Sequence, residues 1–69
     1  MYTDKDYENI NASIDSVTYR IDNISKLIDK WVWAGHAEPN YQLEQKYNIL
    51  CDERDALIAQ RHKIAADLF

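Results

Sequence analysis

Residues 7–31 read YENINASIDSVTYRIDNISKLIDKW, and their apolar side chains recur at alternating steps of three and four residues. This spacing places side chains along one face of an α-helix. The pattern returns between residues 43 and 68, where arginine occupies two of the positions. We call both sets together the seam. Its members are Tyr7, Ile10, Ile14, Val17, Ile21, Ile24, Ile28 and Trp31, followed by Leu43, Tyr47, Leu50, Arg54, Leu57, Arg61, Ile64 and Leu68.

One break separates the two periodic segments, because glycine and proline each occur once, at Gly35 and Pro39. Both residues interrupt helices. We therefore expect one domain over residues 1–69, with helices over about 4–34 and 40–68 and a turn over 35–40. Thr3 suits the N-cap of the first helix, Gly35 suits a left-handed residue after its end, and Pro39 or Asn40 suits the opening of the second helix.

The two helices are expected to pack antiparallel. If the chain folds back near residue 37, every seam position of the first helix lies opposite one of the second, from Trp31 with Leu43 to Tyr7 with Leu68. The predicted fold is therefore all-α, an antiparallel two-helix hairpin resembling a coiled coil.

A hairpin of 69 residues has a thin core, and such chains usually need a further source of stability. Cys51 is the only cysteine, and no metal-ligand spacing joins it to His36 or His62. With a disulfide and a metal site excluded, association with another chain is the remaining source of stability. We therefore expect a homodimer that forms a four-helix bundle. The predicted contact is a row of small or uncharged side chains beside the seam, called here the uncharged flank. It comprises Thr18, Ser25, Cys51, Ile58 and Ala65.

Arg54 and Arg61 are the polar members of the seam. We interpret them as structural residues whose stems cover the core while their charged ends reach carboxylates such as Asp15, Asp22 or Glu53. The alternative is a paired anion site, since guanidinium groups bind phosphate and carboxylate.

A partner-binding surface is predicted on the outer side of the first helix, at Trp33, Tyr19, Asp22 and Asp29. With Trp31 in the seam, Trp33 is rotated about 200° away and should point outward. Exposed Trp and Tyr are enriched at the centres of protein interfaces. Asp15, Asp22 and Asp29 recur every seven residues, which indicates either a solvated face or an anionic row that imitates a phosphate backbone. The alternative for Trp33 is packing over the turn against His36, Pro39 or Tyr41.

The net charge of −4 disfavours direct contact with nucleic acid. The start of the chain lacks a signal-peptide pattern, and no apolar run is long enough for a membrane span, so a cytoplasmic location is expected. No motif indicates a cofactor or catalysis. We expect a small acidic inhibitor or adaptor of the kind encoded by phages and mobile elements, occluding a nucleic-acid-binding or defence protein. The alternative is a structural or chaperone subunit, because the hairpin layout is similar to that of type III secretion needle chaperones.

Overall fold

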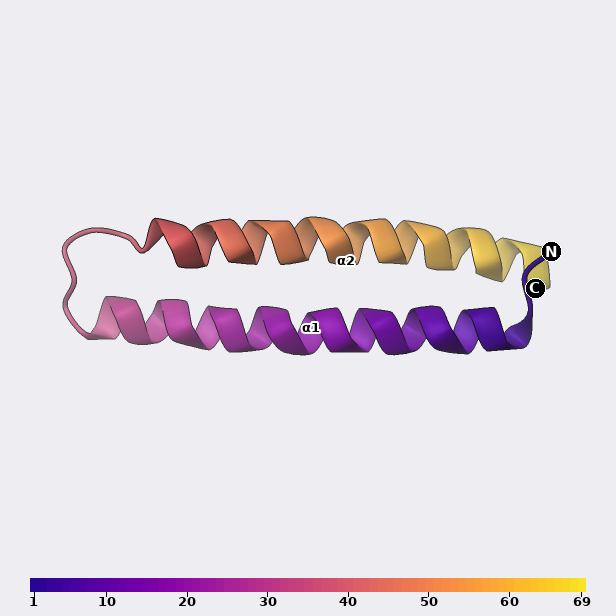
Figure 1. The fold of residues 1–69 in the computed structure, drawn as a ribbon, viewed down its shortest axis with the longest axis horizontal. Coiled ribbons are helices and arrows are strands. Elements are labelled where there is room, and N and C mark those ends of the chain that lie inside the picture. The colour runs from indigo at the N-terminus through magenta and orange to yellow at the C-terminus, as the bar shows by residue number, and fades with distance from the viewer.

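The computed structural model describes residues 1–69 as two helices packed antiparallel, joined by a single turn (Figure 1). Helix α1 spans Asp4–Trp33 and begins at a capping box. The Thr3 hydroxyl accepts from the Asp6 amide at 3.3 Å, and the Asp6 carboxylate accepts from the Thr3 amide at 2.9 Å. Two backbone donors at the start of the helix are therefore satisfied, as the sequence predicts for Thr3.

The turn follows the sequence signals closely. Gly35 lies just past the end of α1 with a φ of 82°, and its amide donates to the Val32 carbonyl. The second helix, α2, spans Tyr41–Leu68 and has Asn40 as its N-cap, whose side chain accepts from the Leu43 amide at 3.2 Å. The left-handed glycine and the Asn40 cap are both confirmed.

The core lies along the seam and is narrow. Its fully buried members are Ile10, Ile14, Val17, Ile21 and Ile64. Every other seam residue is half-buried, the two arginines included. Burial is greatest in the part of α1 remote from the turn, whereas Ile24, Ile28 and Trp31 remain partly exposed. The side chains between the two helices are thus less completely buried near the turn.

The molecule is a rod of 51 × 14 × 14 Å with a radius of gyration of 15.9 Å, against about 11 Å for a compact domain of this length. Its accessible surface is 5433 Å², whereas a folded monomer of this mass exposes about 4,500 Å². The hairpin consequently leaves more surface in water than a globular chain does.

The two termini meet at the end of the rod opposite the turn (Figure 1). The Tyr2 amide donates to the Asp67 carboxylate at 3.1 Å, and the rings of Tyr7 and Phe69 meet edge to face with centroids 5.5 Å apart. These contacts join the start of α1 to the end of α2. Neither helix combines the length and the apolar character needed to cross a membrane.

Candidate protein-binding site

The turn is held by Trp31. Its indole Nε1 donates to the Glu38 carbonyl at 2.7 Å, and its ring stacks on His36 with centroids 3.6 Å apart and an interplanar angle of 11°. Sequence reasoning assigned Trp31 to the seam alone and considered Trp33 as the residue that covers the turn. The half-buried Trp31 both belongs to the seam and covers the turn, because its indole ring reaches His36 and the Glu38 carbonyl.

Trp33 points outward and is 89% exposed. Tyr19 is 69% exposed, and both Asp22 and Asp29 are exposed as well. Residues three and four apart are neighbours on a helix, so Trp33 lies beside Asp29 and Tyr19 lies beside Asp22. The two aromatic rings are not neighbours, because Tyr19 and Trp33 are 14 positions apart, which corresponds to about 21 Å along the helix. The four predicted partner-binding residues therefore form two pairs, each with one aromatic ring and one carboxylate.

The uncharged flank is half-buried within the hairpin itself. Ile58 packs against the buried cluster of Ile10, Ile14 and Ile64, and the Thr18 hydroxyl donates to the Ile14 carbonyl at 2.8 Å. Part of the area that we expected to be free for a second copy is thus already used between α1 and α2.

The seam arginines differ from each other. Arg61 Nη1 donates to Asn11 Oδ1 at 3.3 Å, so the charged end meets an amide instead of the carboxylates that sequence reasoning favoured. Arg54 Nε is buried and has no hydrogen-bond partner. Cys51 lies three residues before Arg54 and Ile58 lies four residues after it, so this arginine borders the uncharged flank. Neutral neighbours on that side explain why no carboxylate reaches it.

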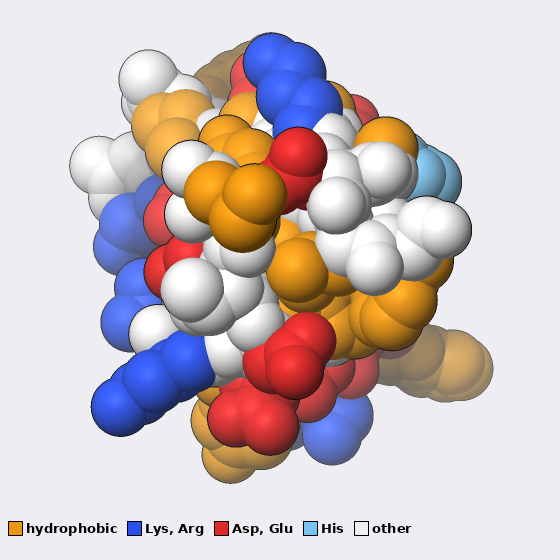
Figure 2. All heavy atoms as spheres, turned by 90° about the vertical axis from the view of Figure 1, so that its right-hand side faces the viewer, with side chains coloured by type: hydrophobic (Ala, Val, Ile, Leu, Met, Phe, Trp, Pro, Cys, Tyr) orange, Lys and Arg blue, Asp and Glu red, His pale blue; other side chains and the backbone are white.

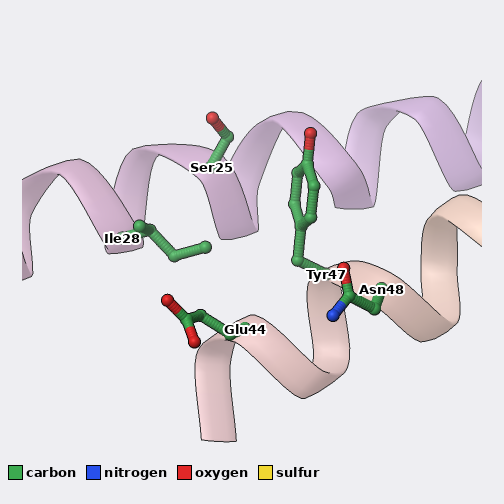
Figure 3. Close-up of a pocket in the computed structure, with 5 residues that line it drawn as sticks. All are labelled: Ser25, Ile28, Glu44, Tyr47 and Asn48. Carbon is green, nitrogen blue, oxygen red and sulfur yellow. The ribbon is translucent and has the colours of Figure 1, made fainter. Parts of the chain in front are cut away.

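An open hollow lies between the helices near the turn, where the seam is least closed (Figure 3). It has a volume of about 370 Å³ and is lined by Ser25, Ile28, Glu44, Tyr47 and Asn48. We call it the turn-end hollow. Ile28 and Tyr47 reach into the gap from opposite helices, and the Glu44 carboxylate points toward Ile28 (Figure 3). Sequence reasoning missed this site, although it placed Ser25 on the uncharged flank.

A smaller hollow of about 200 Å³ lies near the termini. Residues of both helices line it, among them Asp6, Ser13 and Gln60 from the flank opposite the uncharged one. Viewed from this end of the rod, several of the visible Lys and Arg side chains stand along one side (Figure 2). Charge is therefore unevenly distributed around the long axis.

No known protein family matches the chain, and no curated protein or solved structure shows significant similarity to it. The structure contains no group of three or more His, Cys, Asp or Glu side chains placed to hold a metal ion. The geometry of the exposed surface is therefore the basis for a functional proposal.

Proposed function

We propose that the chain is a small acidic protein-binding module that acts as an inhibitor or adaptor and performs no catalysis. The observation that carries the proposal is the position of Trp33, 89% exposed and one helical turn from Asp29. A large aromatic ring surrounded by polar groups is the usual composition of an interface centre. The acidic row suits a basic partner surface, such as that of a nucleic-acid-binding or defence protein.

The test starts with identification of the partner by affinity purification from the native host, followed by calorimetric titration of the purified pair. Trp33→Ala is expected to weaken binding by more than about 2 kcal/mol. Phe69→Ala is the matched control, because Phe69 is 86% exposed at the opposite end of the rod and its loss should leave the affinity unchanged. Replacing Asp22 and Asp29 with Lys should mainly slow association. Equal affinity of the Trp33→Ala and natural proteins would refute the placement.

Self-association into a four-helix bundle is a second proposal, which the extended surface of 5433 Å² and the small side chains of the uncharged flank support. The same flank would suit an amphipathic helix of another protein, as in the structural or chaperone alternative. We expect Ile58→Glu to give monomers in sedimentation equilibrium. Ile49→Glu makes the same chemical change at an exposed isoleucine outside the flank and should leave the assembly intact. A natural protein that is monomeric at micromolar concentration would contradict the dimer.

A further inference from the structure

The turn-end hollow brings together polar groups that the hairpin itself leaves unused. Glu44 supplies a carboxylate, Asn48 an amide, and Ser25 and Tyr47 hydroxyl groups. None of the side-chain hydrogen bonds within the chain involves any of these four residues. The hollow therefore offers acceptors and donors that are free to bind a group from outside the chain.

The lining of the hollow carries negative charge only. Glu44 is the only ionisable group with a charge at neutral pH in the lining, and no Lys or Arg is present there. Asp22 and Asp29 lie three and four residues from Ser25 on α1, so they are its neighbours on the helix surface. Two carboxylates, with Lys26 between them, thus border the hollow on α1. A cation would meet complementary charge from the Glu44 carboxylate at this place.

The shape and the lining favour a planar cation. The ring of Tyr47 extends from α2 toward α1, and the Ile28 side chain and the Glu44 carboxylate lie to one side of it (Figure 3). An arginine side chain combines an apolar stem, a planar group that stacks on aromatic rings, and a fork of donors that matches a carboxylate. A volume of about 370 Å³ lies at the lower end of the range for ligand sites, which suits one side chain more than a larger molecule.

We infer that the turn-end hollow is a receptor for a single arginine side chain presented by the protein partner. The guanidinium binds the Glu44 carboxylate and lies against the Tyr47 ring, while Asn48 offers a further hydrogen bond. This inference rests on the proposed function, and it adds a specificity site on the side of the acidic row away from Trp33.

The test uses a blocked alanine peptide with one central arginine and the same peptide with citrulline, which keeps the shape and removes the charge. Binding is followed by amide chemical shifts of the isotopically labelled full chain. The arginine peptide should shift the amides of Ser25, Glu44, Tyr47 and Asn48, and the citrulline peptide should bind far more weakly. Glu44→Gln should weaken arginine binding about tenfold, because a charge-assisted hydrogen bond is lost. Glu53→Gln removes the same charge from an exposed position on the opposite flank and should change the affinity less than about twofold.

Equal binding of the two peptides, or equal effects of Glu44→Gln and Glu53→Gln, would overturn the inference. Shifts of the same four amides on increasing the concentration of the chain alone would also overturn it, since a second copy would then fill the hollow. These results leave the proposed function standing, because its own test depends on Trp33 and the isolated partner. Conversely, arginine binding at the hollow combined with full affinity of Trp33→Ala would support this site and refute the placement at Trp33.

Discussion

Replacing Arg54 with leucine is expected to stabilise the hairpin. Arg54 Nε is buried without a partner, and an unsatisfied buried polar group costs about 1–3 kcal/mol. The seam register places Arg54 opposite Ile21, which is 5% exposed, so an apolar residue fits the surroundings. Leucine removes the polar cost but covers slightly less of the neighbouring surface than the longer arginine stem does.

The net gain in the free energy of unfolding should be about 1–2 kcal/mol, taken from the lower part of that range. For a domain of this size, each kcal/mol corresponds to a change in Tm of about 4–8 °C, so the expected rise is about 5–15 °C. The measurement is urea and thermal unfolding followed by far-ultraviolet circular dichroism. Both are repeated at two protein concentrations, so that a change in association is not mistaken for a change in hairpin stability.

Two further variants distinguish the effect of the buried, unpaired Arg54 Nε from the effect of losing a positive charge. Arg20→Leu removes an exposed arginine and should change stability by no more than about 0.5 kcal/mol. Arg61→Leu removes the hydrogen bond to Asn11 and should gain less than Arg54→Leu does, because Arg61 has a partner to lose. A clear loss of stability in Arg54→Leu, with Arg20→Leu unchanged, would refute the reasoning. Such a loss would mean that the Arg54 guanidinium makes a favourable contact in solution.

Two predictions concern the turn, both measured by urea unfolding. Gly35→Ala should lower the free energy of unfolding by about 1–2 kcal/mol, because the φ of 82° is unfavourable for any residue with a Cβ. No atom lies within 4 Å of the added methyl group, so the cost comes from the backbone conformation and not from a steric clash. Gly35→Asn should therefore cost less, since asparagine tolerates this conformation better. An equal cost for both would contradict this explanation. Trp31→Phe should cost about 1 kcal/mol through loss of the indole bond to the Glu38 carbonyl, whereas Trp33→Phe should have no effect. Equal effects of the two substitutions would show that the bond does not hold the turn.

The hairpin is predictable because its determinants are periodic and local. The spacing of the seam residues defines the buried face of each helix, and all of them are buried or half-buried in the structure. Thr3, Gly35 and Asn40 act within a few residues of their own position, so their roles can be derived from the sequence. Two helices and one turn follow from these signals alone.

The site is less predictable because it depends on contacts between side chains that are remote in sequence or in different helices. The stacking of Trp31 on His36 requires the path of the turn, which no periodicity describes. The bond from Arg61 to Asn11 joins residues 50 positions apart, and sequence reasoning preferred carboxylates because it weighed charge without geometry. The turn-end hollow exists only where α1 and α2 fail to close, and incomplete packing leaves no pattern in the sequence.

The unpaired Arg54 Nε and the turn-end hollow lie on the same side of the seam. Arg54 borders the uncharged flank through Cys51 and Ile58, and the turn-end hollow meets the same flank at Ser25. A folded chain normally satisfies its buried polar groups, so the unpaired Arg54 Nε is an exception on this side, whereas the Glu44 and Asn48 side chains of the hollow are open to solvent. Small, uncharged side chains between Arg54 and the hollow let a partner approach closely without a large cost of desolvation. Both proposals, a second copy along the flank and a basic partner at the hollow, therefore concern this one side of the hairpin.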